Sequence, residues 1–554
     1  MNVREIVESL IYSVVARKLE EWGEKTDLSV QVEAPRQESH GDFSSNAAMQ
    51  IARRLGKKPR QVAEELVTAI REEDGGKLIA SLEIAGPGFI NIFLSESVWA
   101  QVILRALSES ERFGSSEVGA GETVLLEFVS ANPTGPLHVG HGRGAAVGDA
   151  LGRILEFTGH KVVREYYVND VGNQMDNLGR SLLARYRTEC GRPTNLPEDG
   201  YKGEYMVELA RELRAECGDR YADAPDDEAL PIFRKEAGDR ILSGIRKDLE
   251  SFRVRYDNWF PEKELHERGE VAGAVDELRD HGKLYEAEGA TFLRSGEMGD
   301  EKDRVLVRAD GRTTYFAADV AYHRNKLRRG FARLINILGA DHHGYVARMR
   351  AALRALAGSD SALEVLLVQF VTLVRDGSPV QMSTRSGEFT TLREVLDEVG
   401  VDAARFFYLL RSFHTHLDFD LTLAKKEERV NPVYYVQYVH ARICSIFREA
   451  QARGETLEPN PPVSILTLPA EIRLMKAVAR FPEAVLDSAR LREPHRIPFY
   501  LIEIADQFHA FYHQHRFIGE SSERTQARLA LAKAVKTVVA AGLSLIGVAA
   551  PERM

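Results

Sequence analysis

The chain has 554 residues, of which 44% are hydrophobic and 28% are charged, and its formal net charge is −10. At 100–200 residues per domain, this length predicts roughly three to five globular units, each with its own core. The acidic balance excludes a protein that coats nucleic acid through overall charge, so any RNA contact must use local basic patches. Three cysteines, none in a CxxC pair, argue against a disulfide framework and against a structural metal.

The two most apolar-looking parts of the chain do not resemble targeting segments. Residues 1–20 alternate apolar and charged side chains, as in an amphipathic helix, and lack the apolar core of a signal peptide. Residues 529–550 are interrupted by Lys533 and Lys536, short of the ~20 apolar residues of a membrane span. The sequence therefore predicts a cytoplasmic protein without a membrane partner.

The pattern of predicted elements divides the chain into three parts. Residues 1–115 predict an α+β module, with helices over 2–22, 44–55 and 59–73, strand-like alternation over 82–94, and a linker over 108–121. Residues 116–390 alternate strands and helices, with strands expected over 123–129, 161–168, 305–307, 334–338 and 365–374, and a helix over 139–158. This alternation is typical of a doubly wound parallel sheet.

Two stretches depart from that alternation. Residues 177–302 are charged and mostly helical, which predicts an insertion, and residues 391–554 are expected to be entirely helical. The predicted fold is therefore a Rossmann-like α/β nucleotide-binding domain between an N-terminal α+β domain and a C-terminal all-α helical bundle.

The sharpest signal is the run Ser-Ala-Asn-Pro-Thr-Gly-Pro-Leu-His-Val-Gly-His at residues 130–141, between a predicted strand and a predicted helix. A helix N-terminus presents unpaired N–H groups and a partial positive charge, both of which favour phosphate. His138 and His141 share a face of the first turn and can donate hydrogen bonds to the phosphoryl oxygens of ATP. Gly140 leaves room for a flat ring against the backbone. The alternative, two polar histidines at a surface helix, fits a bare HxGH but not this strand–loop–helix context.

These residues carry a resemblance to a known family. His138-Val-Gly-His141 resembles the HIGH signature of class I aminoacyl-tRNA synthetases, and the longer run from Glu127 to His141 resembles the arginyl branch. The resemblance extends over nearly the whole chain, including His40-Gly-Asp-Phe, Asn431-Pro-Val-Tyr-Tyr-Val-Gln-Tyr and Ala550-Pro-Glu-Arg-Met. It implies a monomeric arginine–tRNA ligase that uses ATP with Mg²⁺. Arginyl-adenylate forms first, and arginine is then transferred to the 3′-terminal ribose of its tRNA with release of AMP and pyrophosphate.

The second signature of that class, KMSKS, has a degenerate counterpart in Gln381-Met-Ser-Thr-Arg385. Met382 and Ser383 match the signature, but both lysines are missing. Arg385 is the expected substitute, since a guanidinium can bind phosphate bidentately and keeps its charge. Arg375 is the reserve candidate, and a solvated turn residue is the alternative interpretation of it. The resemblance implies that Met382, Ser383 and Arg385 bind ATP, and that the last two act with both histidines in catalysis.

A pocket for arginine needs carboxylates in bidentate geometry, because the substrate presents a planar cation with five donors. Glu127 lies on the first strand of the nucleotide domain, and Tyr315 and Asp319 are four residues apart on one predicted helix face. The resemblance implies that these three residues hold the guanidinium. It also implies that Asn132 binds the α-amino group and that His342 contacts the amino acid or adenosine. The alternatives are an ion pair with a nearby Arg or Lys for Glu127, and an exposed helix charge for Asp319.

Residues 431–453 interleave aromatic and basic side chains, including Tyr434, Tyr438, His440 and Arg442. Such a pattern suits stacking on bases and pairing with phosphate in tRNA, and the alternative is tyrosines packed in a bundle core. A second cluster at 508–516 has the same two interpretations. The resemblance implies that the C-terminal domain reads the anticodon region and that the N-terminal module contacts the outer corner of the tRNA.

Two other functions fit part of the sequence. Another HIGH-type enzyme, such as a cysteinyl synthetase, would need zinc ligands that the cysteines do not supply. A small-carboxylate ligase would not need the long helical C-terminus. A non-enzymatic RNA-binding paralogue would explain the missing lysines but not the intact histidines and acids.

Overall fold

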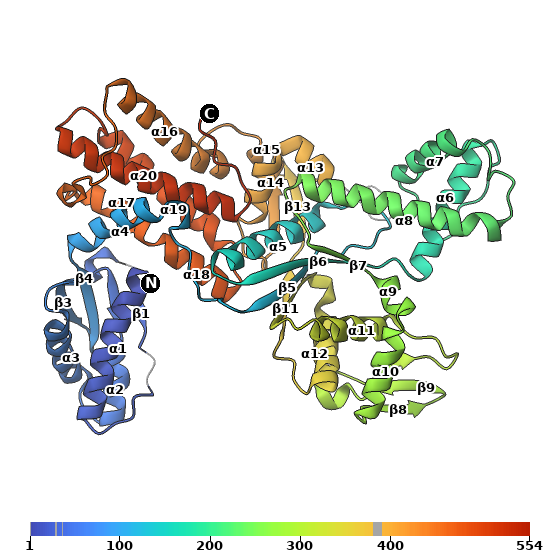
Figure 1. Ribbon diagram of the computed structural model, residues 1–554, viewed down its shortest axis with the longest axis horizontal. Helices are drawn as coiled ribbons and strands as arrows, with labels where there is room; N and C mark the ends of the chain where they lie inside the picture. Colours follow the sequence, from blue (N-terminus) through green and yellow to red (C-terminus); the bar gives the residue numbers. More distant parts are fainter. Residues whose placement is uncertain (1, 28–29, 36, 381–389) are drawn as a thin grey trace.

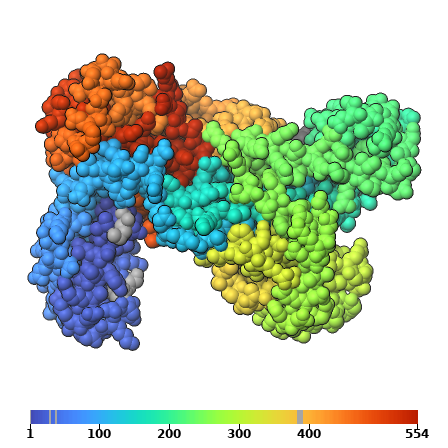
Figure 2. Space-filling model, viewed as in Figure 1, coloured from blue at the N-terminus to red at the C-terminus, as the bar shows by residue number. Residues whose placement is uncertain are grey.

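The computed structural model describes residues 2–27, 30–35, 37–380 and 390–554. Figure 1 shows an N-terminal module in blue beside a C-terminal helical bundle in orange and red, with the α/β domain in the middle. In Figure 2 a wide hollow separates the N-terminal module from the yellow-green lobe of the middle domain. No helix within the described ranges is both long enough and apolar enough to cross a membrane.

The N-terminal module packs three helices on a four-stranded antiparallel sheet of order β1-β2-β4-β3. Its elements are α1 (Val3–Glu21), β1 (Val32–Glu33), β2 (Phe43–Ser45), α2 (Ala47–Leu55), α3 (Pro59–Asp74), β3 (Ile79–Ala85) and β4 (Phe89–Leu94). The predicted helix from residue 44 starts three residues later, because residues 43–45 pair with β4 as a strand. An unpredicted helix, α4 (Glu96–Glu109), follows and packs against α17 and α20 of the bundle.

A five-stranded parallel sheet of order β12-β11-β5-β6-β7 forms the centre of the molecule. Its strands are β5 (Thr123–Phe128), β6 (Lys161–Val168), β7 (Asn258–Pro261), β11 (Arg333–Gly339) and β12 (Leu363–Val368). Along β5, Leu126 and Phe128 join the core shared with α5 (Val139–Phe157), whereas Leu125 joins the core shared with α11 (Tyr315–Arg328) and α12 (His343–Ala357). Helices therefore cover both faces, which confirms the doubly wound fold.

The predicted helical insertion is only partly correct. The helices α6 (Asn173–Glu189), α7 (Glu204–Cys217) and α8 (Asp226–Ser251) project to one side in Figure 1. The chain then returns to the central sheet as β7, parallel to β6, before the helices α9 (Glu262–Glu267) and α10 (Glu270–Asp280). A four-residue strand is too short to show a periodic pattern, so the sequence alone did not reveal it.

Two predicted strands also differ from those in the structure. Residues 305–307 belong to β10 (Arg304–Val307), which pairs with β9 (Ala290–Leu293), and β9 pairs in turn with β8 (Leu284–Ala287) in a separate antiparallel sheet. The predicted strand 365–374 divides into β12 and β13 (Val371–Arg375). β13 pairs antiparallel with β14 (Ser378–Pro379) and parallel with β15 (Leu417–Asp420), so the C-terminal third is not entirely helical.

The C-terminal bundle otherwise follows the predicted helices. Its elements are α13 (Leu392–Val399), α14 (Val401–Tyr408), α15 (Leu421–Ala424), α16 (Pro432–Ala452), α17 (Pro469–Ala479), α18 (Phe481–Leu491), α19 (Arg496–Gln514) and α20 (Ser522–Leu545). Residues 469–491 form two helices, because Pro482 in the first turn of α18 cannot continue α17.

Candidate active site

The chain turns sharply where β5 leaves the sheet. Val129 and Ser130 have φ angles of 66° and 40°, a left-handed conformation that is costly for a β-branched valine. The Ser130 N–H donates to the Phe128 carbonyl at 2.9 Å, and the Ser130 Oγ accepts from the Tyr167 N–H at 3.0 Å. These contacts hold the loop 130–137 over the carboxyl edge of the sheet, where ligands bind in doubly wound folds.

His138, Gly140 and His141 lie together at the start of α5. His138 is the N-cap residue, and its Nδ1 accepts from the Gly140 N–H at 3.1 Å. The Nδ1 of His141 accepts from the His138 N–H at 3.2 Å, and the two rings stack with centroids 3.6 Å apart. A β-carbon on Gly140 would lie 3.0 Å from the His138 ring, so this glycine leaves room for the stacked imidazoles.

Both imidazoles are neutral near pH 7. Burial lowers the pKa of His138, and burial followed by the His138 charge lowers the pKa of His141 to about 3. Since Nδ1 of each ring accepts a backbone N–H, the proton of each neutral ring must lie on Nε2. The helix start therefore offers two side-chain donors in addition to its backbone N–H groups, an arrangement that suits a phosphate group.

The sequence-predicted residues for arginine are distributed around this edge. Tyr315 begins α11 and is exposed, and Asp319 follows one turn later on the same helix, as predicted. Asn132 donates to the Gln174 side chain at 2.8 Å. His342 lies after β11 in an exposed 3₁₀ turn, 3.6 Å from Asp341.

Glu127 forms the ion pair that the sequence analysis gave as an alternative to a substrate contact. Its side chain is buried on β5, and its Oε2 accepts a hydrogen bond from the ammonium of Lys326, a fully buried residue of α11. Glu127 is therefore not an isolated acid of the pocket, and any contact with substrate has to coexist with this ion pair.

Asp319 is partly buried and forms an acidic cluster with the buried Glu262, the first residue after β7. Burial and then the Glu262 charge raise the pKa of Asp319 from 3.8 to about 7. Burial likewise raises the pKa of Glu262. The Tyr167 side chain is buried beside both acids, and it interacts more strongly with Glu262 than with Asp319. Two acids and a phenol gathered in this way favour an organic cation as ligand.

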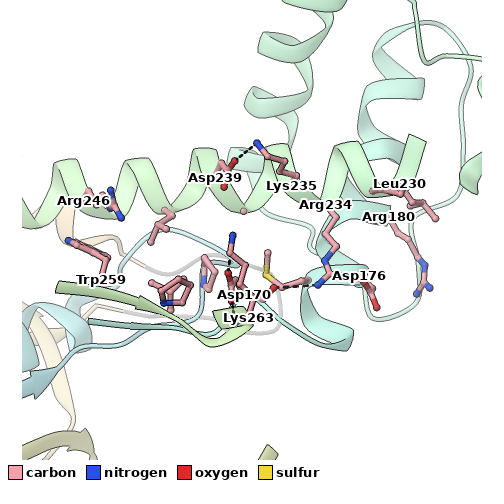
Figure 3. Close-up of a pocket in the computed structure, with 17 residues that line it drawn as sticks. Asp170, Asp176, Arg180, Leu230, Arg234, Lys235, Asp239, Arg246, Trp259 and Lys263 are labelled. Atoms are coloured by element: carbon pink, nitrogen blue, oxygen red, sulfur yellow. Dashed lines mark hydrogen bonds and ion pairs between the residues drawn. The ribbon is translucent and has the colours of Figure 1, made fainter. Parts of the chain in front are cut away.

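A cavity of about 610 Å³ opens between this edge and the helices α6 and α8 (Figure 3). Pro133 of the α5 loop lines it, together with Asp170 and Lys263 next to Glu262. At one end the Arg246 guanidinium lies 4.5 Å from the centre of the Trp259 ring. The cavity thus combines an aromatic surface with basic groups.

Comparison with protein-family models identifies all three parts of the chain. Residues 9–94 match the arginyl tRNA synthetase N terminal domain, residues 102–407 the catalytic domain of tRNA synthetases class I (R), and residues 436–554 the DALR anticodon binding domain. The chain belongs to the arginyl-tRNA synthetase family.

Curated arginine–tRNA ligases are similar to this chain over nearly all of its length. The arginine–tRNA ligase of Syntrophotalea carbinolica is 50% identical over 527 residues, 95% of each chain, and that of Bacillus licheniformis is 44% identical over the full length of both. The structure of Thermus thermophilus arginyl-tRNA synthetase superimposes with a TM-score of 0.78 over all of both chains at 24% identity, which shows a shared fold.

In this arginyl-tRNA synthetase, α16 presents the predicted aromatic and basic side chains together. The rings of Tyr434 and Tyr438 stack 6.0 Å apart, and Arg442 lies over the rings of Tyr438 and Tyr512 at 4.4 and 4.3 Å. His440, which belonged to the same predicted surface, is instead buried, and its Nδ1 bonds to the Pro551 carbonyl at 2.8 Å.

Several predicted residues lie outside this description, and several others were missed. Met382, Ser383 and Arg385 fall in residues 381–389, outside the described ranges. Sequence reasoning did not identify Glu262, Tyr167 or Lys326. Tyr167 is the last residue but one of β6, as Glu127 is of β5, so its position could have indicated a side chain near the same sheet edge. The sequence offered no such indication for Glu262, because β7 was not predicted.

Proposed function

We propose that arginyl-adenylate forms in the cleft at the carboxyl edge of β5, β6 and β7. The family joins arginine to tRNA at the expense of ATP, and so does this chain. This location is supported by the acidic cluster of Glu262 and Asp319, which lies on the same sheet edge as the neutral histidines of α5. One end of this cleft suits a cation and the other suits phosphate.

The guanidinium of arginine is held by Asp319 and Glu262, with the Tyr167 hydroxyl as a further partner. A wrong amino acid would leave these buried acids unpaired, which gives strong selectivity without an editing step. Glu127 contributes the carboxylate oxygen that Lys326 does not occupy. Tyr315 and His342 close the pocket from α11 and the β11 end.

ATP lies against the start of α5 with its Mg²⁺. The Nε2–H groups of His138 and His141 donate to phosphoryl oxygens as the carboxylate of arginine attacks the α-phosphorus and pyrophosphate leaves. Asn132 binds the α-amino group. Met382, Ser383 and Arg385 are assigned to the pyrophosphate side from the resemblance to KMSKS alone.

The tRNA contacts all three domains, which we take as 1–115, 116–390 and 391–554. Its single-stranded 3′ end enters the cavity between α6 and α8, where Trp259 offers a stacking surface and Arg246 a charge. Tyr434, Tyr438 and Arg442 of α16 face the anticodon region. The enzyme acts as a monomer in the cytoplasm.

Arginine-dependent exchange of pyrophosphate into ATP, measured with and without tRNA, tests this function. Exchange with arginine alone among the amino acids is the expected result. The variant Trp259→Ala should raise KM for tRNA by about tenfold and leave KM for ATP unchanged. Absence of exchange from a folded protein that still binds tRNA would favour an inactive RNA-binding paralogue instead.

A further inference from the structure

Three polar residues form a row across the central sheet on the face that α11 covers. The strand register places Glu127 of β5 directly beside Glu165 of β6 and Asn336 of β11. All three side chains are buried. Polar groups in such a position need partners, and α11 supplies them.

The row has two separate sets of partners on α11. Glu165 accepts from the Tyr322 hydroxyl at 2.7 Å and from both terminal nitrogens of Arg329 at 2.5 and 2.7 Å. Glu127 and Asn336 share Lys326, whose ammonium donates to Glu127 Oε2 and to Asn336 Oδ1, the latter at 3.0 Å. Lys326 is thus the common partner of β5 and β11.

The Lys326 contacts continue to the segment that carries Asp319. The amide of Asn336 lies 2.9 Å from Nε2 of His323, and Nδ1 of His323 lies 2.9 Å from the Asp319 carbonyl oxygen. A carbonyl can only accept, so His323 donates through Nδ1 and accepts from Asn336 through Nε2. Burial followed by the Lys326 charge lowers the pKa of His323 to about 3, which keeps the ring neutral, as this pattern requires.

We propose that Lys326 is a positioning residue for arginine: it fixes the Glu127 carboxylate through one oxygen and, through Asn336 and His323, fixes the turn of α11 that carries Asp319. This inference rests on the proposed function, in which Glu127 and Asp319 contact arginine. Lys326 itself does not reach the substrate, because its ammonium is fully buried and contacts the Glu127 and Asn336 side chains and the Tyr322 ring.

The charges of the pocket explain why a lysine stands at this position. Glu127, Glu262 and Asp319 lie close enough to influence one another. Three ionised carboxylates facing one monovalent cation would leave uncompensated negative charge in a buried site. Lys326 compensates one carboxylate permanently and also prevents it from turning toward its neighbours.

The test compares Lys326→Met with Arg329→Met, a control that removes the partly exposed ion pair between Arg329, the C-cap residue of α11, and Glu165 of β6. With tRNA present, KM for arginine and for ATP is measured for both variants, and the melting temperature is recorded. K326M should raise KM for arginine by about tenfold or more and change KM for ATP by less than about twofold, whereas R329M should lower the melting temperature and change both constants little. Equal effects of K326M and R329M on KM for arginine would overturn the proposal.

A double-variant cycle tests the route through Glu127. If Lys326 acts in part by fixing this carboxylate, K326M should raise the arginine KM by a smaller factor in the E127Q background than in the unmodified enzyme, because the Glu127 charge is then absent. If the arginine KM of the double variant rises by the product of the two single-variant factors, the route through Glu127 is refuted. If K326M does not fold, Asn336→Ala decides: it keeps the ion pair, breaks the link to His323, and should raise KM for arginine about threefold, whereas an unchanged value would refute the link.

The variant Asp319→Asn, measured in parallel, separates this inference from the proposed function. A specific rise in KM for arginine in D319N, with K326M equal to R329M, would reject the role of Lys326 alone. An unchanged KM for arginine in D319N would reject the pocket itself.

Discussion

Arginine should bind more weakly as the pH falls below about 7, because a neutral Asp319 cannot pair with a guanidinium. Burial and the nearby Glu262 charge raise the pKa of Asp319 to about 7 in the free protein. A raised carboxyl pKa means that the ionised form predominates only above that value. Arginine affinity should therefore be nearly constant above about pH 8 and fall through pH 7, with a dissociation constant about tenfold higher at pH 6 than at the plateau.

The same pKa gives the number of protons released. If the bound guanidinium keeps Asp319 ionised, binding should release about 0.9 proton at pH 6, about 0.5 at pH 7 and about 0.1 at pH 8. The rise from 3.8 to about 7 corresponds to about 4 kcal/mol of unfavourable free energy for the ionised side chain above pH 7. Arginine offsets part of this cost, so it should raise the melting temperature more at pH 8 than at pH 6.

Isothermal titration calorimetry in buffers of different ionisation enthalpy measures both quantities. Asp319→Asn should abolish the proton release in this range. His266 lies 3.5 Å from Glu262, so His266→Gln serves as the control and should leave the release unchanged. A dissociation constant that does not change between pH 6 and 8, with no proton released, would refute the reasoning.

Three further variants probe the remaining parts of the site. Gly140→Ala places a β-carbon 3.0 Å from the His138 ring, which should disturb the stacked imidazoles and lower kcat for pyrophosphate exchange about tenfold with KM for arginine little changed; an unaltered kcat would show that their arrangement is unimportant. Arg385→Ala should lower the single-turnover rate of activation by about tenfold, and an unchanged rate would remove Arg385 from the mechanism. Arg442→Ala removes the cation over the Tyr438 ring and should raise KM for tRNA about tenfold in aminoacylation assays, whereas equal changes for arginine would indicate a folding defect.

Local spacing predicted the parts of the site that lie within one helix or one strand-to-helix turn. His138 and His141 had to share the first turn of α5, and Tyr315 and Asp319 had to share one side of α11, because a helix repeats every 3.6 residues. The order of elements also predicted the doubly wound sheet. These features depend on residues that are near one another in the sequence.

Glu262 could not be predicted in this way. Its position depends on β7, which follows a helical excursion from residue 173 to 251 and pairs with β6 from Glu165 to Val168. No periodic pattern in four residues fixes that register. The same limit applies to β13 and β15, whose pairing joins segments on either side of α13 and α14.

The ion pair of Glu127 with Lys326 shows that a buried acid can pair with a basic residue and still contact the substrate. The sequence left open a substrate contact or an ion pair with a basic residue, and the ion pair is present, with Lys326, 199 residues further along the chain. A carboxylate has two oxygens, so one can bind Lys326 while the other faces the cleft. Burying the charge of Glu127 without a partner would cost several kcal/mol. A pocket that binds a cation through several buried acids therefore needs a basic residue of the protein to balance part of their charge. Such a pairing joins residues that are far apart in the sequence, so local spacing cannot predict it.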